Sequence, residues 1–267
     1  MFTEESVLSN GISIPRLGFG TYLIPEENAA EAVRAAIGIG YRHIDTAQAY
    51  ENEHGVGEGI RASGIAREDI FVTSKVMAEY KSYDEAVRSI DESLSVSKLG
   101  WFDFMLIHCP QPWDEYGSEY RYPEENRAVW KALEEAYEAG RVRAIGVSNF
   151  NEWDIDSLLV TAKIKPMVNQ FACFAGYTDL ELINKCFSLG ILPEAYSPLG
   201  HGDVFANKKL AEIAERYGVT VSRLCIRYTL QLGMISIPKT VHPDRMKENT
   251  LVDFVISNED MELLKSM

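Results

Sequence analysis

The sequence is poor in cysteine and histidine, and neither type is arranged as a metal site would require. The four cysteines, Cys109, Cys173, Cys186 and Cys225, form no C-x-x-C pair, and the five histidines do not stand at metal-ligand spacing beside them. This pattern predicts reduced structural thiols, as in a cytoplasmic protein, and no metal site.

Basic residues and long apolar runs are also scarce. Lys and Arg total 26 against 40 Asp and Glu, a net charge of −14 that repels nucleic acid and anionic membranes. No stretch approaches about 18 uninterrupted apolar residues. The acidic start "MFTEESVLSNG" lacks the basic and apolar segments of an export signal. We expect a cytoplasmic protein with no membrane or nucleic-acid partner.

Linkers are missing too, because no Pro/Ser-rich tract or shift of composition divides the chain. The length of 267 residues suits one closed α/β barrel, which typically needs about 250 residues. We therefore predict a single domain over residues 1–267, and nothing in the sequence demands more than a monomer.

What the sequence does contain is a repeated alternation of short apolar runs and longer segments with helical period. Helical patterns include "EENAAEAVRAAIGIG", "YDEAVRSIDESLSVSKLG", "NRAVWKALEEAYEAG" and "NKKLAEIAERYG". Eight strands are predicted, at Leu17–Gly20, Arg42–Asp45, Ile70–Ser74, Phe102–His108, Ala144–Ser148, Met167–Phe171, Leu192–Tyr196 and Ile235–Pro238.

Eight such units fit either a (β/α)8 TIM barrel or a doubly wound open sheet. An open sheet that binds a nucleotide normally carries G-x-G-x-x-G after its first strand. Here "GFGTYL" lacks the third glycine and "GVGEGI" follows no strand, so the barrel is favoured. Before the first strand, Asn10-Gly11 within "VLSNGISIP" predicts a β-hairpin with a two-residue turn that plugs one end of the barrel.

Polar side chains stand at the ends of most predicted strands, where the active sites of such barrels lie. They are Asp45, Lys75, His108, Ser148, Asn149, Gln170 and Tyr196. We expect all of them to face one mouth, whereas His43 falls inside its strand and is expected to pack in the core.

Lys75 needs a carboxylate partner if it is buried, and Asp45 is the nearest strand-end candidate. A tyrosine beside that ammonium would have its pKa lowered, which makes Tyr50 a candidate proton donor to a carbonyl oxygen oriented by His108. Two plainer interpretations remain open at this point: the lysine and aspartate form only a salt bridge, and the histidine is an ordinary core residue.

Carbonyl reduction also needs a hydride donor, which we look for in the loops after the last two strands. Tyr196 offers an aromatic face on which a nicotinamide ring could stack. Lys239, Thr240 and Arg245 form a local basic cluster that an acidic protein otherwise lacks. The alternative is a solvated surface run before the last helix.

These residues resemble the aldo-keto reductase family along nearly the whole chain, in particular bacterial members of the diketogluconate reductase kind. The matching motifs are "GYRHIDTAQAYENEHGVGEGI", "TSKV", "FDFMLIHCP", "GVSNF", "NQ", "EAYSPLG" and "IPKT" with the Arg and Asn that follow it. The resemblance implies a (β/α)8 barrel, NADPH as cofactor, and metal-free reduction of a small aldehyde or ketone to an alcohol.

The resemblance also assigns roles to single residues. It implies a catalytic tetrad of Asp45, Tyr50, Lys75 and His108. Substrate contacts would come from Tyr22, Met77, Cys109 and Trp113. Cofactor contacts would come from Gly20, Thr21, Ser148, Asn149, Gln170, Tyr196, Ser197, Leu199, Gly200, Lys239, Thr240, Val241, Arg245, Glu248 and Asn249. Lys239 and Arg245 would hold the 2′-phosphate, which favours NADPH over NADH.

The chain departs from the family pattern around the substrate. Met77 and Cys109 stand where relatives often carry Trp, "FACFAG" replaces the usual run after Gln170, and the chain stops at Met267 where many relatives continue. An open, less apolar pocket is therefore expected. The segment "QPWDEYGSEYRYP" either supplies Trp113, Tyr116 or Tyr120 to the pocket or merely covers a helix end.

Two other functions are weighed against the reductase. A cofactor-binding sensor or interaction subunit would have no need of the complete tetrad. A Schiff-base enzyme that uses Lys75 on a phosphorylated sugar would leave the tyrosine and stacking motifs unexplained. The hypothesis that accounts for all the motifs is an NADPH-dependent carbonyl reductase with Tyr50 as general acid.

Overall fold

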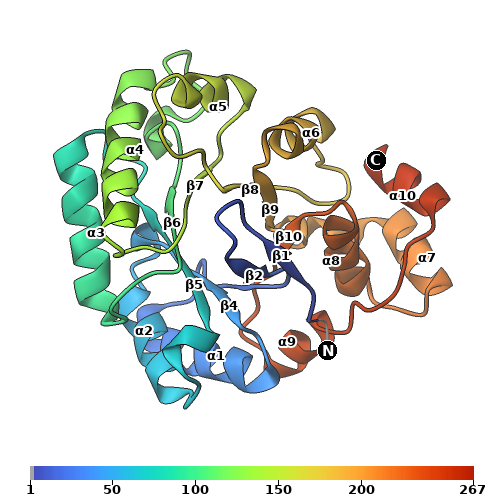
Figure 1. Ribbon diagram of the computed structural model, residues 1–267. Coiled ribbons are helices and arrows are strands. Elements are labelled where there is room, and N and C mark those ends of the chain that lie inside the picture. Colours follow the sequence, from blue (N-terminus) through green and yellow to red (C-terminus); the bar gives the residue numbers. More distant parts are fainter. Residues whose placement is uncertain (1–2) are drawn as a thin grey trace.

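The computed structural model describes residues 3–267, and its centre is one parallel sheet of eight strands in the order β10-β9-β8-β7-β6-β5-β4-β3 (Figure 1). Every predicted strand corresponds to an observed one. The strands are β3 (Phe19–Gly20), β4 (His43–Asp45), β5 (Phe71–Val76), β6 (Phe104–Ile107), β7 (Ile145–Ser148), β8 (Val168–Ala172), β9 (Leu192–Tyr196) and β10 (Ile235–Ile237).

The sheet closes between its first and last strands. The backbone N–H of Gly18 donates to Ser236 O at 2.9 Å, and that of Gly20 donates to Pro238 O at 3.1 Å. In return the N–H of Ser236 donates to Arg16 O at 2.8 Å. These bonds leave neither edge strand unpaired, so the sheet is a barrel.

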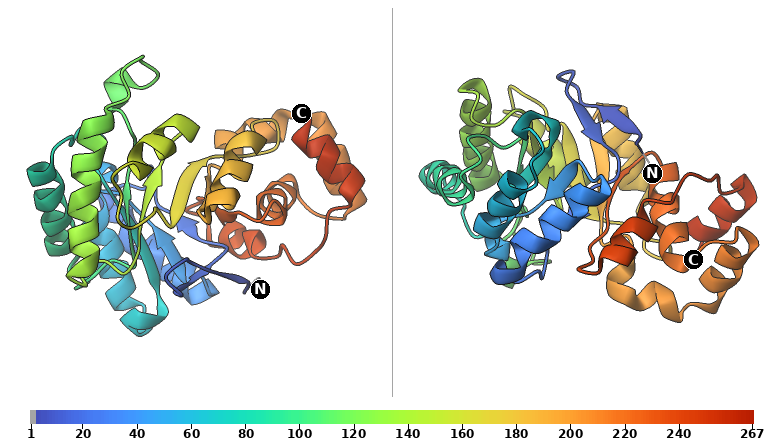
Figure 2. Two further views of the ribbon diagram at one scale, coloured as in Figure 1. Left: turned by 45° about the horizontal axis from the view of Figure 1, so that its top comes forward. Right: turned by 90° about the horizontal axis from the view of Figure 1, so that it is seen from below.

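Helices surround the barrel, as Figures 1 and 2 show, and most connections from one strand to the next contain at least one. The predicted (β/α)8 fold is thereby confirmed. The helices are α1 (Glu26–Ile39), α2 (Glu53–Ala62), α3 (Tyr83–Ser97), α4 (Pro123–Glu138), α5 (Glu152–Leu159), α6 (Leu180–Leu189), α7 (Lys208–Arg216), α8 (Val221–Gln231), α9 (Pro243–Asn249) and α10 (Asn258–Lys265).

The barrel strands are buried on both faces because side chains fill the interior and helices cover the outside. β6 and β7 are buried at every position. The strand β5 runs two residues beyond its predicted end, to Val76, and is buried throughout. Lys75 therefore belongs to a strand rather than to the loop after it.

The N-terminal hairpin consists of β1 (Glu5–Val7) and β2 (Ser13–Pro15), which pair antiparallel. Its turn differs from the two-residue turn predicted at Asn10-Gly11. The N–H of Leu8 donates to Ile12 O, which leaves three residues in the loop, and Gly11 takes the left-handed conformation at φ 86°. A three-residue loop needs glycine at this last position only.

The hairpin covers the amino-terminal end of the barrel, as predicted. Leu8 and Ile14 are buried in the same cluster as Phe71 and Phe104, and the Asn10 side chain donates to Arg143 O at 3.0 Å. In the right view of Figure 2 the hairpin projects from one end of the strands. Only the carboxyl end of the barrel is thereby left for a site.

Candidate active site

A cavity of about 1510 Å³ lies at the carboxyl ends of the barrel strands. Such a volume exceeds that of a typical site for one drug-sized molecule. Its wall includes most residues that the sequence singled out: Gly20, Tyr22, Asp45, Tyr50, His108, Trp113, Ser148, Asn149, Gln170, Tyr196, Ser197, Leu199, Lys239, Thr240, Arg245, Glu248 and Asn249.

Lys75 is buried behind this wall with three partners for its three ammonium protons. Its Nζ donates to Asp45 Oδ1 at 2.7 Å, to Thr46 O at 2.8 Å and to the Tyr50 hydroxyl at 3.2 Å. Burial on its own lowers the pKa of this ammonium, but Asp45 and Tyr50 outweigh burial, and the pKa is raised. Lys75 is therefore a cation at neutral pH.

Asp45 is held on both oxygens and through its backbone. Its Oδ2 accepts from Gln170 Nε2 at 2.8 Å, and its carbonyl oxygen accepts from Thr21 Oγ1 at 2.9 Å. The carboxylate is almost fully buried, so its charge is balanced locally by Lys75. The aspartate thus fixes the position of the ammonium, as predicted from the strand-end pattern.

Tyr50 ends a short 3-10 helix, η1 (Gln48–Tyr50), that follows β4, and its ring faces the cavity. The ring lies 5.1 Å from that of Tyr22 and 5.5 Å from that of His108, centroid to centroid. The predicted lowering of its pKa is wrong. Burial raises the pKa of the Tyr50 phenol and outweighs the opposing effect of Lys75.

His108 follows β6 at the mouth, and its side chain is uncharged at neutral pH. Burial, with a smaller contribution from the Lys75 charge, holds its pKa well below the usual value. Within residues 3–267, its Nδ1 is buried and has no hydrogen-bond partner. A neutral ring can offer one nitrogen as a donor and the other as an acceptor to an oxygen bound beside Tyr50.

His43 lies in the barrel interior, as predicted, and contacts a second acid that sequence reasoning did not single out. Its Nε2 lies 3.1 Å from Thr73 Oγ1 and 3.8 Å from Glu194 Oε1. Glu194 is fully buried, and neither carboxylate oxygen has a hydrogen-bond partner within residues 3–267. Burial first, and then the Asp45 charge, raise the pKa of Glu194 to about 8.

Ser148, the last residue of β7, and Asn149, which follows it, lie between His108 and Tyr196. Asn149 has the left-handed φ of 62°, which turns its side chain so that Nδ2 donates to His108 O at 2.9 Å. Its Oδ1 accepts from the Tyr196 hydroxyl at 2.8 Å. Ser148 Oγ accepts a further bond from Asn149 Nδ2 at 3.1 Å. The tyrosine is thereby fixed against the wall.

The opposite end of the cavity carries positive charge. Lys239 and Arg245 are exposed, and in the described part of the chain neither has a carboxylate within 4.0 Å. Sequence reasoning missed much of this lining. The missed residues at this end lie in the loop after β9, in α7, and in the turn before α8 and its first residues: His201, Gly202, Phe205, Ala211, Ala214, Glu215, Gly218, Val219, Thr220, Val221 and Ser222.

Six of the predicted site residues do not line the cavity: Thr21, Lys75, Met77, Cys109, Gly200 and Val241. Thr21 and Lys75 act from behind it through the bonds described above. Cys109 is fully buried, so it is not available to a substrate. Gly200 lies against the Phe174 ring, which a Cβ would approach to 2.9 Å, so this position excludes a side chain.

Aromatic side chains line one part of the pocket although Met77 and Cys109 stand where relatives often carry Trp. Trp113, from the loop after β6, stands perpendicular to the His108 ring with centroids 5.2 Å apart. Together with Tyr22 and Tyr50 it forms an aromatic wall beside His108. The last helix, α10, packs instead on α7, where Asp260 pairs with Arg216.

Residues 3–267 contain no cluster of three or more His, Cys, Asp or Glu side chains that could hold a metal ion. All four cysteines are buried and unbridged. A search of the same residues found no helix with the length and apolar character needed to cross a membrane.

Comparison with known proteins gives consistent results. The model of the Aldo/keto reductase family matches residues 16–267. A glyoxal reductase of Bacillus subtilis is 41% identical over 262 residues, 97% of this chain and 91% of the relative. A morphine 6-dehydrogenase of Pseudomonas putida is 36% identical over 275 residues, 97% of this chain and 90% of the relative.

Solved structures agree with the fold. An aldo/keto reductase from Brucella melitensis superposes with a TM-score of 0.91 at 35% identity and covers 99% of both chains. A Bombyx mori aldo-keto reductase, solved in complex with NADP, has a TM-score of 0.89 at 31% identity, with 100% of this chain and 93% of that chain covered.

Proposed function

Since this chain belongs to the aldo-keto reductase family, we propose that it reduces aldehyde or ketone carbonyls to alcohols with NADPH. The observation that carries the proposal is the bonded series of Asp45, Lys75 and Tyr50, with His108 in the same wall. A protein that only bound the cofactor would have no use for a buried, fully partnered ammonium beside a phenol.

The shape and chemistry of the cavity support NADPH as the cofactor, which supplies the hydride when bound. The flat ring of Tyr196 suits a nicotinamide, and the amides of Asn149 and Gln170 suit its carboxamide. At the other end Lys239 and Arg245 lack carboxylate partners and suit an extra phosphate. NADH has no such phosphate, so this pair favours NADPH.

Tyr50 is the proposed proton donor. Its raised pKa keeps the phenol protonated at neutral pH, as a general acid requires. As negative charge develops on the carbonyl oxygen, the hydroxyl gives up its proton, and the Lys75 ammonium at 3.2 Å stabilises the phenolate that forms. Asp45 keeps that ammonium in place, and the neutral ring of His108 orients the carbonyl oxygen.

The aromatic wall suggests which carbonyl compounds fit. Trp113 and Tyr22 are partly exposed at the mouth and suit a substrate with an apolar or planar substituent beside its carbonyl group. A relative bears the name glyoxal reductase, so small dicarbonyl compounds belong among the candidates.

The test is oxidation of NADPH measured in parallel against aldoses, aldehydes, diketones and keto acids. Turnover of at least one aldehyde or diketone, with NADH far less effective than NADPH, is the expected result. Tight binding of NADPH without oxidation by any of these classes would contradict the proposal and favour a sensor or interaction subunit.

A further inference from the structure

Trp113 lies on a loop with little regular structure, between β6 and α4, that we call the 109–122 loop. The loop contains one short 3-10 helix, η3 (Trp113–Glu115), and residues 113–120 are exposed. In the left view of Figure 2 it projects, in green, beyond the ring of helices. The perpendicular contact between the indole and the His108 ring at 5.2 Å therefore needs support from elsewhere.

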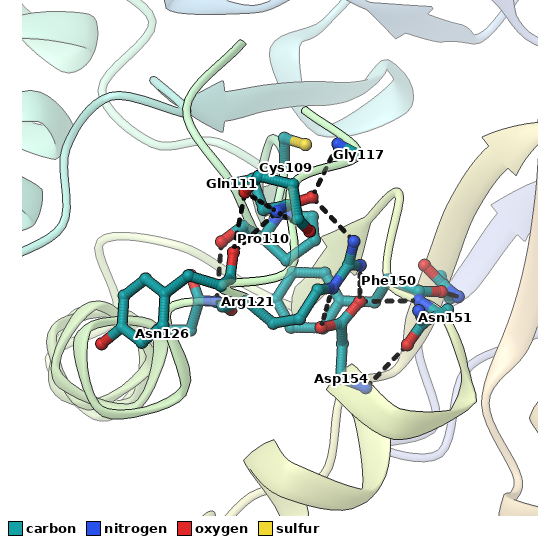
Figure 3. A network of polar contacts seen from close by, with 12 residues as sticks. Cys109, Pro110, Gln111, Gly117, Arg121, Asn126, Phe150, Asn151 and Asp154 are labelled. Carbon is teal, nitrogen blue, oxygen red and sulfur yellow. Dashed lines mark hydrogen bonds and ion pairs between the residues drawn. The ribbon is translucent and has the colours of Figure 1, made fainter. Parts of the chain in front are cut away.

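Gln111 provides that support inside the loop. Its side chain is fully buried, and its Nε2 donates to Tyr120 O at 2.7 Å and to Ser118 O at 3.0 Å. Its Oε1 accepts from the backbone N–H of Gly117 at 3.1 Å and from Arg121 Nη1 at 2.7 Å. One satisfied amide thus closes the whole tip of the loop (Figure 3).

Arg121 connects the loop tip to α5, the helix after β7. Its Nε donates to Asp154 Oδ1 at 3.0 Å and its Nη2 pairs with Asp154 Oδ2, so the contact is a two-point fork (Figure 3). The Asp154 side chain is only 1% exposed. Because the carboxylate is buried, loss of its cationic partner is costly, and the fork ties the loop tip to the barrel.

Asp154 is itself fixed next to the catalytic end. It lies in the first turn of α5 and forms a reciprocal cap with Asn151, whose N–H donates to Asp154 Oδ2 at 3.0 Å. Two residues earlier stands Asn149, which holds Tyr196. The loop tip is therefore attached to the same segment that lines the proposed nicotinamide site.

The base of the loop has a separate attachment. Lys81 Nζ donates to Cys109 O at 3.0 Å, and Asn126 Nδ2 donates to Pro110 O at 2.9 Å. These bonds do not involve the Arg121 side chain. Two exposed bonds also reach the scaffold, from the Tyr120 hydroxyl to Glu125 at 3.0 Å and from the Trp113 N–H to Glu79 at 3.5 Å. Loss of the guanidinium fork should consequently loosen residues 111–120 without unfolding the strand end or α4.

We propose that Arg121 is a positioning residue: by joining Gln111 to Asp154 it holds Trp113 over His108 and so sets how tightly carbonyl substrates bind. The substrate half of this proposal presupposes the proposed function, whereas the structural half does not. Neither Arg121 nor Asp154 lines the cavity, so neither side chain contacts a substrate bound there.

Arg121→Lys tests the proposal, because lysine keeps the charge and loses the fork. Arg67→Lys is the matched control. Arg67 pairs with Asp103 at 2.8 Å, its partner is equally buried, and Asp103 lies just before β6, at the opposite end of the barrel. Asp154→Asn serves as a second variant that retains an oxygen for the α5 cap.

Hydrogen exchange is the first readout, and it does not depend on turnover. We expect Arg121→Lys to speed exchange in residues 111–120 about tenfold, which corresponds to about 1.4 kcal/mol, while Arg67→Lys leaves this segment unchanged. Unchanged exchange in the loop of both Arg121→Lys and Asp154→Asn would overturn the proposal. This result stands even if the protein proves to reduce no carbonyl.

Steady-state kinetics is the second readout. We expect Arg121→Lys to raise KM for an aromatic aldehyde roughly tenfold with little change in kcat or in the Kd of NADPH, because Trp113 binds substrate rather than reacting. In a Trp113→Ala background the same substitution should add almost nothing. An undiminished effect in that background, or a loss confined to kcat, would show that Arg121 does not act through Trp113.

Discussion

Nζ of Lys75 lies 3.2 Å from the hydroxyl oxygen of Tyr50, deep enough that the ammonium has no contact with solvent. A buried cation at this distance stabilises the phenolate more than the phenol. Burial nevertheless has the larger effect, so the pKa of Tyr50 is raised and the phenol keeps its proton. The residue therefore holds a proton until negative charge appears beside it, and the effect of removing its hydroxyl can be predicted.

Tyr50→Phe should abolish most turnover and leave NADPH binding nearly intact. General acid catalysis is commonly worth roughly 10²-fold to 10⁴-fold, and kcat should fall by that order. NADPH affinity is measured in the same samples by fluorescence titration. Tyr83→Phe, whose hydroxyl bonds Glu135 of α4 away from the cavity, is the control and should keep full activity. Comparable turnover in the Tyr50 variant would remove the role assigned to it.

Lys75→Met should destabilise the fold as well as inactivate it. The substitution leaves Asp45 buried without its counter-ion, a change that typically costs about 3–5 kcal/mol. Urea unfolding at neutral pH measures the loss. Adding Asp45→Asn to Lys75→Met should restore part of the stability but none of the activity. A double variant no more stable than the single one would contradict this electrostatic explanation.

Glu194 predicts a specific dependence of stability on pH. Its pKa is about 8 in the folded protein against an ordinary value of 4.5, so between these values the folded state holds a proton that the unfolded state has lost. Its contribution to stability is therefore complete below the lower value and is lost as pH rises through the higher one.

Glu194→Gln should remove this titration. Relative to wild type, the variant should gain stability on the order of 3 kcal/mol between about pH 5 and about pH 8. Urea unfolding at several pH values measures the difference. Glu31→Gln, an exposed change on α1, is the control and should follow the wild-type curve. Parallel curves for wild type and Glu194→Gln would show that the buried acid does not titrate in this range.

Arg245→Gln should change the choice of cofactor. A charge-assisted bond to a phosphate is worth about 1.5–3 kcal/mol, so the Kd of NADPH should rise about tenfold to a hundredfold while that of NADH stays nearly constant. Lys247→Gln is the matched control, since Lys247 is exposed on the same helix but does not line the cavity. Equal weakening of both cofactors would argue against a 2′-phosphate contact.

The sequence was sufficient to predict the barrel and the meeting of Asp45, Tyr50, Lys75 and His108 at its mouth. Strand alternation indicates where each strand ends, and in a parallel barrel those ends meet at one mouth, which brings Asp45, Lys75 and His108 together. That inference needs only the order of elements, because the regular geometry of the fold supplies the distances. A single domain, a monomeric state and a cytoplasmic location stay predictions.

The loops and the energetics were beyond this reasoning. The side chain of Cys109 follows a strand end, yet its burial depends on how the 109–122 loop folds around Gln111. The pKa of Tyr50 depends on how completely packing removes water, which no spacing of residues expresses. Glu194 begins the quoted motif "EAYSPLG" but received no role, because a buried acid looks the same in a sequence as an exposed one.

The bonds of Gln111 have a consequence for how this enzyme can diversify. They close the tip of the 109–122 loop on itself, and the tip joins the scaffold at Arg121, at the loop base and through bonds of Trp113 and Tyr120 to Glu79 and Glu125. The exposed residues of such a segment can be substituted to suit a new substrate while Gln111 and Arg121 are kept. Libraries confined to residues 113–120 should therefore alter substrate range far more often than they destroy the fold.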